Sequence, residues 1–553
     1  MHLRNSIAFS AALATAAAAL SQPAHATLAS GYTGVPSANP KTSGIAVPNV
    51  LTPELVQTAL VQGSAKLENG TSAIPYYGYC GDGTMLPAPG AVQLPGSNIE
   101  ATKSEPDKNV YLVLPGQTGA DAAYDYGTHF VYQGHENAAV DAASGLKTGY
   151  ITRVNLDADA AHRVTLLATH DAAGTLLPVI DGATWDPFCR RLLFTAEGGA
   201  TTGGVWQATV GFPSTVVDIS GYLGRGGYEG IQNDGQGNVY LVEDVGGTKG
   251  TVNSHARQPN SFLYRYLPTN IADLTAGGVL QALQVESIAN PGQPIVFHAG
   301  QADADILSQD IADMHTYGLV FVTHWVTIHD TAVDGTAPFS ANALAKAASA
   351  TPFKRPENGV FRPGSDFAEF YFTATGDTDA NTEAGSLFGG FGAIFAWKKT
   401  AGSTIDGTLS LLYRCDIDHS GFDNIAFWGA DELVAVEDRG DTLHAQHNAL
   451  DSAFLFDATV DYGNVGAPAP LRLLALGRDA SATLDSGLLG VSGNGFQNDG
   501  DNEITGIHVS DGNPRAMGIL GARVPTPFAS GWRVFYAQQH GDNTLFEVLP
   551  NPH

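Results

Sequence analysis

The sequence has few basic residues. Of its 553 residues only 27 are Lys or Arg, against 55 Asp or Glu, which gives a formal net charge of −28. Nucleic acids and anionic membranes require a basic face, so we expect neither as a partner. Beyond the N-terminal region no apolar run has the length of a membrane span, and we expect none.

Cysteine is also scarce. The chain has three, Cys80, Cys189 and Cys415. An odd number allows one disulfide at most, and no close pair of cysteines suggests a zinc site. One disulfide and three unbridged thiols are both compatible with this count.

The first 26 residues are typical of an export signal. Arg4 precedes an apolar, Ala-rich stretch at 7–20, and Ala24-His25-Ala26 is a small-x-small cleavage site. We therefore expect residues 1–26 to be removed and the protein to be periplasmic or secreted. Residues 27–125 are then a lead-in segment that we expect to lie against a larger domain at 126–553.

That larger domain is built from a two-part unit that recurs about six times. In each unit a short apolar strand ends at an Asp, Glu or His, and a second apolar strand follows. Such repetition, with Gly and Asp in the turns, predicts an all-β fold, a six-bladed β-propeller. The expected strand pairs are 130–136 with 150–156, 192–197 with 204–210, 239–244 with 262–267, 319–324 with 393–397, 433–438 with 453–457, and 534–540 with 545–549.

The fourth unit is interrupted by a long segment. We expect an insertion at about 325–392 that contains a short helix at 341–350 and folds over one mouth of the propeller channel. The insertion carries Arg355 and Glu357, which are two residues apart in a Pro-containing extended stretch and should point to the same side. A second short helix is expected at 53–60, because Pro53 suits a first helical position.

Acidic residues open several of the short strands that precede the repeat units. They are Asp181, Glu229, Asp423 and Glu503. Because the inner strands of a propeller converge on one axis, these acids and those that end the following strands should share one cavity. Clustered carboxylates repel one another, and a bound cation relieves the repulsion, so the pattern predicts a metal site with oxygen ligands. The alternative is that they are ordinary polar groups at strand ends.

Six short segments, taken in order, resemble those of the PhoX-type alkaline phosphatases, a family of exported six-bladed propellers. The segments are GHEN (134–137), TAE (195–197), YRY (264–266), RPE (355–357), EITG (503–506) and QQHG (538–541). The resemblance implies hydrolysis of phosphomonoesters at a cluster of calcium and iron ions. It also implies metal roles for Glu136, Glu197 and Glu357, and a phosphate-binding role for Arg355.

The sequence and the resemblance together define a candidate site. Arg355 and Glu357 are the expected catalytic residues, and the expected metal ligands are Glu136, Glu197, Glu229, Glu357 and Glu503. The family's iron-ligating Cys has no counterpart at 179–185. We therefore expect Ca²⁺, with Fe³⁺ as a further possibility.

The expected function is that of an exported, metal-dependent phosphoesterase acting on a small phosphorylated substrate. One alternative is a calcium-dependent lactonase or arylesterase, in which His135 or His540 would move protons to or from an ester substrate. A second alternative is a propeller that is stabilised by calcium and binds ligands without catalysis.

Overall fold

The computed structural model describes residues 31–35, 39, 49–81, 103–140, 145–477, 503–519, 521–539 and 543–552. The expected signal at 1–26, and also His540, lie outside these residues. Within the described ranges, no helix combines the length and apolar character that crossing a membrane requires.

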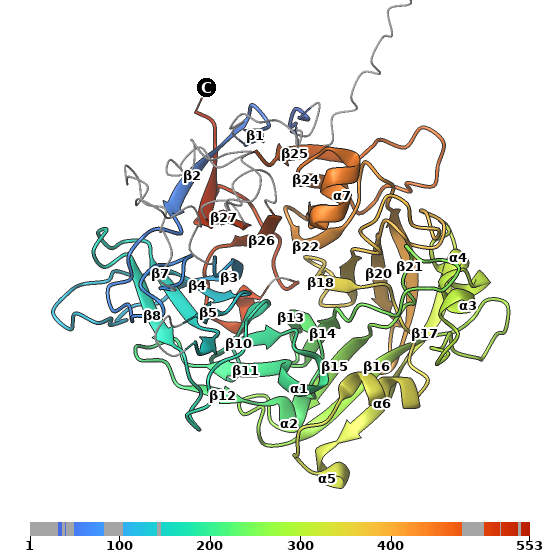
Figure 1. Cartoon of the computed structure of the whole chain (residues 1–553), viewed down its shortest axis with the longest axis horizontal. Coiled ribbons are helices and arrows are strands. Elements are labelled where there is room, and N and C mark those ends of the chain that lie inside the picture. The colour runs from blue at the N-terminus through green and yellow to red at the C-terminus, as the bar shows by residue number, and fades with distance from the viewer. Residues whose placement is uncertain are drawn as a thin grey trace, which may run out of the picture.

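Antiparallel sheets are arranged in a ring around a central axis (Figure 1). The first sheet is β3-β4-β7-β8, with β3 (Pro106–Val113), β4 (His129–His135), β7 (Ile151–Asn155) and β8 (Val164–Ala168). The second is β9-β10-β11-β12, with β9 (Ala183–Asp186), β10 (Arg191–Ala196), β11 (Gly204–Ala208) and β12 (Val216–Asp218). Each is a meander in which sequential strands pair, as in a propeller blade.

The next sheet has nine strands. It contains two four-stranded meanders that β17 (Val320–Asp330) joins by pairing with both β16 and β21. Its two ends, β13 and β18, contact each other, so the sheet curves into a nearly closed barrel. The remaining strands are β13 (Tyr228–Asn233), β14 (Val239–Glu243), β15 (Leu263–Pro268), β16 (Gly278–Val285), β18 (Pro356–Phe361), β19 (Glu369–Ala374), β20 (Ala393–Lys399) and β21 (Asp406–Arg414).

Strands from the two ends of the chain complete the last two sheets. β2 (Leu55–Val61) pairs with the C-terminal β28 (Thr544–Pro550), and β1 (Val50–Leu51) pairs with β25 (Leu471–Ala475). This pairing closes the ring non-covalently. The other strands are β22 (Phe422–Phe427), β23 (Glu432–Glu437) and β24 (Ser452–Asp457) beside β25, and β26 (Glu503–Ser510) and β27 (Arg533–Gln539) beside β28.

Short helices and a two-stranded sheet lie outside the larger sheets of the ring. The two-stranded sheet is β5 (Ala139–Val140) with β6 (Lys147–Thr148). The helices are α1 (Gly199–Thr202), α2 (Ser220–Leu223), α3 (Ala302–Ile306), α4 (Gln309–Met314), α5 (Thr331–Asp334), α6 (Ala341–Ala347), α7 (Gly440–His447) and the 3-10 turn η1 (Ala516–Gly518).

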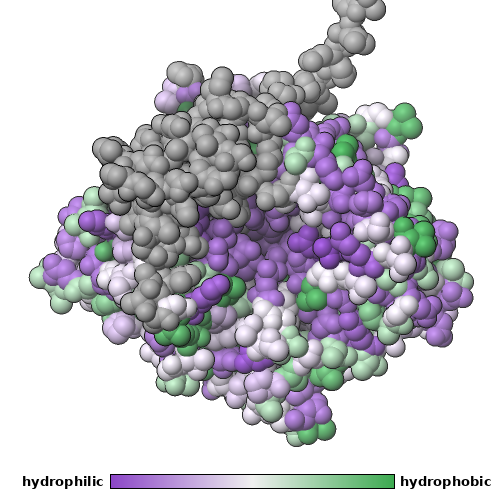
Figure 2. Space-filling view, in the orientation of Figure 1, coloured by the Kyte–Doolittle hydropathy of each residue, from purple (hydrophilic) through white to green (hydrophobic). Residues whose placement is uncertain are grey.

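Six strands face the centre of the ring: β3, β9, β13, β18, β22 and β26. Each of them contacts the next around the axis, and β26 contacts β3. Apolar side chains fill the spaces between the sheets; Phe456, for example, packs against both Phe422 and Tyr413 in one cluster. The centre itself is hydrophilic, as the hollow in the middle of Figure 2 shows.

The structure corrects the expected architecture in three respects. In the part of the chain that the structure describes, four sheets are separate blades, because β17 fuses the other two meanders into the nine-stranded barrel-like sheet; the prediction of six separate blades is wrong in this respect. The expected insertion at 325–392 contains the end of β17, strands β18 and β19 and helix α6, so it contributes strands to the sheet instead of interrupting a blade; its position over the mouth of the channel stays a prediction. Residues 53–60 form most of strand β2 and not a helix, because pairing with β28 outweighs local helix propensity.

Candidate metal and substrate site

Carboxylates gather at one end of the central axis, where the inner strands of the ring begin. They come from the start of the first strand of a sheet and from the end of its second strand, which antiparallel pairing brings to the same edge. The pairs are Asp107 with Glu136, Asp181 with Glu197, Glu229 with Asp244, and Asp423 with Asp438; Glu357 and Glu503 occupy the first position in the sheets of β18 and β26.

In four inner strands the acid lies where the strand bulges. The pairing register shifts between Pro106 and Asn109, and the same shift recurs around Glu229, Glu357 and Asp423. A bulge leaves a residue outside the regular ladder and redirects its side chain. This shared irregularity turns each acid toward the axis.

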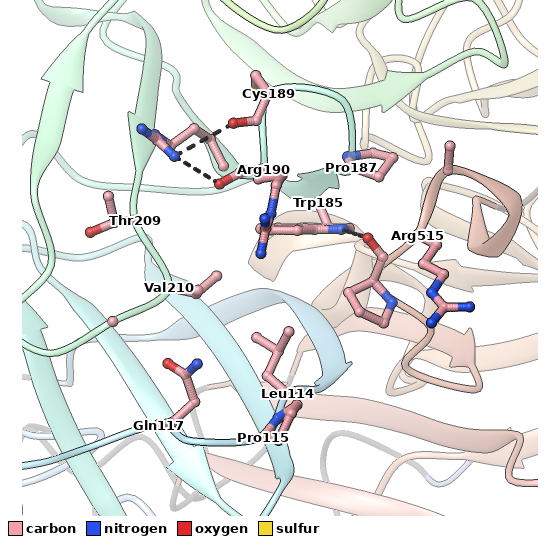
Figure 3. Close-up of a pocket in the computed structure, with 14 residues that line it drawn as sticks. Leu114, Pro115, Gln117, Trp185, Pro187, Cys189, Arg190, Thr209, Val210 and Arg515 are labelled. Atoms are coloured by element: carbon pink, nitrogen blue, oxygen red, sulfur yellow. Dashed lines mark hydrogen bonds between the residues drawn. The ribbon is translucent and has the colours of Figure 1, made fainter.

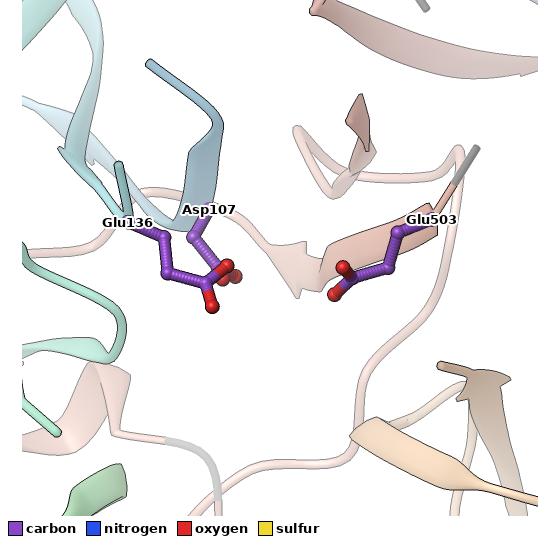
Figure 4. A group of neighbouring side chains, drawn as sticks. All are labelled: Asp107, Glu136 and Glu503. Atoms are coloured by element: carbon purple, nitrogen blue, oxygen red, sulfur yellow. The ribbon is translucent and has the colours of Figure 1, made fainter. Parts of the chain in front are cut away.

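The carboxylate oxygens lie close enough together for several residues to bind the same ion. In four groups of three residues, one oxygen from each residue lies within 4.8 Å of those of the other two. Figure 4 shows one group, in which Asp107, Glu136 and Glu503 point toward one another from three strand ends. The other groups are Glu136 with Asp181 and Glu197, Glu197 with Glu229 and Asp244, and Glu229 with Glu357 and Asp423.

These groups share members and form one continuous cluster. All five predicted metal ligands, Glu136, Glu197, Glu229, Glu357 and Glu503, belong to it. The structure therefore brings together residues that lie up to 367 positions apart in the sequence, from Glu136 to Glu503. Their binding of metal stays a prediction.

Burial and mutual repulsion alter the acidity of the cluster. Burial, followed by the charge of Asp244, raises the pKa of Glu197 to about 7. Burial, followed by the charges of Asp107 and Asp438, raises the pKa of Asp423 to about 8. The pKa of Glu229 is raised by burial and then by Glu357, Asp181 and Glu197. Without cations, the cluster therefore cannot ionise fully near neutral pH.

One lysine lies among the acids. Lys108 follows Asp107 on β3, is 4% exposed, and donates from Nζ to Asn358 Oδ1 at 2.9 Å. Burial lowers its pKa, while Asp423, Asp107, Asp181 and Glu229 oppose that shift. A single ammonium group cannot balance so many carboxylates.

Arg355 lies at the edge of the cluster. Its Nε donates to Asp244 Oδ2 at 2.9 Å, and its Nη2 lies 2.8 Å from the same oxygen and 3.4 Å from Glu357 Oε1. The backbone there is left-handed, with φ of 49°. The preceding Lys354 pairs with buried Asp377 at 2.8 Å and anchors the turn. Arg355 thus presents a guanidinium beside the carboxylates, with 21% of its side chain exposed.

The donor set fits a hard cation. It consists of carboxylate oxygens, and Asp244 Oδ1 is buried without a hydrogen-bond partner among the described residues. Oxygen ligands of this kind suit Ca²⁺. All three cysteines are buried, no disulfide joins them, and none is in the cluster; Cys189 lies in the turn after β9, at the opposite end of that strand.

The site contains acids that the sequence does not predict as ligands. The sequence predicts Asp181 and Asp423 only as strand-opening acids, and it does not predict Asp107 or Asp244 as ligands. Asp107 could have been found by aligning its segment PDKN with FDNI at 422–425 and PENG at 356–359, which share the acid at the bulge.

His135 does not serve the site in the way that the lactonase alternative requires. It is fully buried, its ring stacks on Tyr150, and its Nε2 lies 2.9 Å from Thr152 Oγ1. Burial lowers its pKa to about 3, so it is neutral and shielded from substrate.

Comparison with known proteins agrees with this geometry. A family model described as Alkaline phosphatase PhoX matches residues 219–466. The resemblance to the PhoX alkaline phosphatases is confirmed. The matched stretch contains Arg355 and four acids of the cluster, Glu229, Asp244, Glu357 and Asp423, whereas Glu136, Glu197 and Glu503 lie outside it.

A solved PhoX structure shares its fold with this chain. The structure of Pseudomonas fluorescens PhoX in complex with vanadate, a transition state analogue, is 11% identical, with a TM-score of 0.53, and the match covers 94% of this chain and 98% of that one. A gluconolactonase from Xanthomonas campestris is also 11% identical over 80% of this chain and 97% of its own, but its TM-score is only 0.31, which is too low for a structural argument. No curated protein matches the chain in sequence.

Proposed function

We propose that this protein is a metal-dependent phosphoesterase that hydrolyses phosphomonoesters. The observation that carries the proposal is the continuous carboxylate cluster with Arg355 at its edge, in a chain that matches the PhoX family. The family match supports a phosphatase-like hydrolase, and the donor set supports Ca²⁺ as the ion, with Fe³⁺ as the alternative.

Arg355 is the proposed phosphate-binding residue. Asp244 and Glu357 engage its Nε and Nη2, which fixes the plane of the guanidinium. Among the described residues its polar contacts involve Nε and Nη2, so Nη1 can donate to a phosphoryl oxygen. A preoriented guanidinium loses little freedom on binding an anion, and its charge-assisted hydrogen bonds are strong.

The carboxylates are the proposed metal ligands. Bound Ca²⁺ would act as a Lewis acid toward the phosphoryl group. The chain itself places oxygen ligands from each blade and from the nine-stranded sheet at the same end of the central axis. It also keeps several of these carboxyl groups protonated until a cation binds. Cation binding should therefore release protons from acids such as Glu197 and Asp423.

The decisive assay is hydrolysis of an aryl phosphate by the purified protein, with Ca²⁺ present and after chelation. We expect turnover with Ca²⁺ and its loss with chelator. We expect Arg355→Gln to lower kcat/KM by about 10²-fold to 10³-fold, the range for loss of one preorganised donor to developing charge. Arg355→Lys should restore only part of this, because an ammonium group lacks the planar fork.

Arg362 provides a matched control for Arg355. It also carries two ion pairs, with Glu369 and Asp431, and 20% of its side chain is exposed, but it follows the opposite end of β18. Arg362→Gln should leave kcat/KM unchanged. If neither Ca²⁺ nor Fe³⁺ supports turnover while chelation still lowers the melting temperature, the ions are structural and the phosphoesterase proposal fails.

Export is part of the same proposal. Cleavage after Ala26, followed by periplasmic or secreted localisation, would leave Thr27 as the first residue. The mass of the protein recovered from the periplasm or the medium of an expressing bacterium tests this, and an intact N-terminus would contradict it.

A further inference from the structure

A second cavity lies away from the carboxylates, where the inner strands end. It has a volume of about 820 Å³. Its lining includes Leu114 after β3, Trp185 on β9 and Arg515 after β26. Each of these strands has an acid of the cluster at or next to its first residues and runs away from it, so the cavity and the carboxylates are separated by the length of the inner strands.

The charge of this cavity is opposite to that of the whole chain. Three arginines line it, Arg190, Arg191 and Arg515, and no acidic residue does so in the part of the chain that the structure describes. The protein has only 27 Lys and Arg residues and a formal net charge of −28. Among the described residues, no ion pair involves Arg190 or Arg515, and both are exposed. Their guanidinium groups are therefore available to an anion.

The cationic turn is held in place by hydrogen bonds. Asp186 Oδ1 accepts from the backbone N–H of Phe188 at 2.8 Å and of Cys189 at 3.2 Å. Arg191 Nη1 donates to the carbonyl of Arg190 at 3.0 Å, and Arg190 itself is in the left-handed region, with φ of 56°. The turn that presents Arg190 is therefore formed before any ligand arrives.

The walls of the cavity are largely apolar. Trp185 donates from Nε1 to the carbonyl of Pro514 at 2.8 Å, which joins β9 to the segment that carries Arg515. Figure 3 shows the labelled side chains converging on one space from separate segments of the chain. Gln117 adds a buried acceptor, Oε1, that has no partner within the described structure. The apolar lining includes Leu114, Pro115, Trp185, Pro187, Val210 and Pro514.

We infer that this cavity binds a small organic anion with an aromatic or apolar body. Arg190 and Arg515 would bind its phosphate, phosphonate or carboxylate group, because guanidinium donors match the geometry of such anions. Trp185 and the adjacent apolar residues would bind the body, since ligand pockets combine an apolar lining with a few polar anchors. This inference is independent of the proposed phosphoesterase activity.

Calorimetric titration of the intact protein with phenylphosphonate, which phosphatases do not hydrolyse, tests the inference. We expect saturable binding that Arg190→Gln/Arg515→Gln weakens at least 10-fold and that Trp185→Phe weakens several-fold. Lys399→Gln is the matched control, because it also removes an exposed positive charge but at the end of β20, away from the cavity; its affinity should equal that of the wild type. Benzoate should bind as well, and inorganic phosphate at least 10-fold more weakly because it has no body.

Arg355→Gln separates this cavity from the proposed substrate site. If the anion binds at the second cavity, Arg355→Gln retains the binding. If Arg355→Gln abolishes it while the double variant binds as the wild type does, the inference is overturned. Equal affinities for phenylphosphonate and inorganic phosphate would overturn the role of the apolar walls. The phosphatase assay is a separate measurement, so either proposal can fail alone.

A measurement on the wild-type protein tests the inference even if the variants do not fold. Phenylglyoxal modifies accessible arginines, and mass spectrometry locates the modified residues. Phenylphosphonate should slow the modification of Arg190 and Arg515 and leave that of Arg362 unchanged. Equal rates with and without phenylphosphonate would overturn the inference.

Discussion

At the scale of single residues, the site depends on acids placed at irregular points of the inner strands. Asp107, Glu229, Glu357 and Asp423 each coincide with a shift in strand register. A regular strand would alternate its side chains between the two faces, so an acid there would point between sheets. The bulge explains how an apolar strand can still deliver one carboxylate to the axis.

Lys108 tests the charge balance of this cluster. Replacing it with Met removes the buried cation that Asp423, Asp107 and Asp181 face. Breaking a buried ionic network by removing one partner costs about 3–5 kcal/mol. We expect Lys108→Met to lower the melting temperature, and to lower it more in chelator than with Ca²⁺, because the ions neutralise the same carboxylates.

Lys354 is the matched control for Lys108. It is 5% exposed and pairs with Asp377, outside the carboxylate cluster. Lys354→Met should destabilise the protein to the same extent with and without Ca²⁺, as thermal unfolding would show. An identical metal dependence for the two variants would contradict the balancing role of Lys108.

At the scale of elements, close approach between neighbouring inner strands brings their acids together. Gly182 separates Asp181 from β9, and a Cβ at that position would lie 1.7 Å from the backbone oxygen of Glu229 and 2.3 Å from Thr195 Oγ1. Only a glycine allows the start of β9 to approach β13 so closely. The distance between Asp181 and Glu229 therefore depends on this one missing side chain.

Gly182→Ala should force β9 and β13 apart. Overpacking typically costs about 1–3 kcal/mol, and contact with backbone rather than a flexible side chain places this case at the upper end. We also expect weaker Ca²⁺ binding, measured by titration calorimetry. Gly429→Ala is the control, because nothing lies within 4 Å of its added Cβ; a Gly182→Ala protein as stable as this control would refute the argument.

At the scale of the whole molecule, folding of the ring buries many carboxyl groups close together, and this burial disfavours their ionised form. Burial raises the pKa of Asp107 to about 6, of Glu197 to about 7 and of Asp423 to about 8. When a folded acid has a raised pKa, the native state binds more protons than the unfolded state as pH rises above about 4. The stability of the metal-free protein should therefore fall as pH increases from about 4 to about 8.

The predicted fall in stability with rising pH can be tested directly on protein from which a chelator has removed the metal. We expect its melting temperature to be higher at pH 5 than at pH 8, and we expect added Ca²⁺ to raise the melting temperature most at pH 8, where the carboxylates are ionised. Thermal unfolding followed by circular dichroism would measure both effects. A Ca²⁺ effect that is equal at the two pH values would show that the ions do not bind the carboxylate cluster.

The sequence alone determined most of the strand pairs and the acids at their ends. Five of the six expected pairs are present, among them β4 with β7 and β23 with β24, because apolar strands and Gly- or Asp-containing turns are local signals. The pair 319–324 with 393–397 is wrong, since β17 instead pairs with β16 and β21. An 11-residue strand that joins two meanders has no local signature.

Only the tertiary structure decided that Asp107 joins the predicted acids and that an arginine-lined cavity lies at the other end of the inner strands. Asp107 precedes the first expected repeat unit and enters the cluster because β3 lies between β26 and β9 around the axis. The arginine-lined cavity likewise combines turns from 114 to 516 that no sequence spacing connects. Short-range patterns specify strands and turns, whereas contacts between distant segments arise from how the sheets close around the axis.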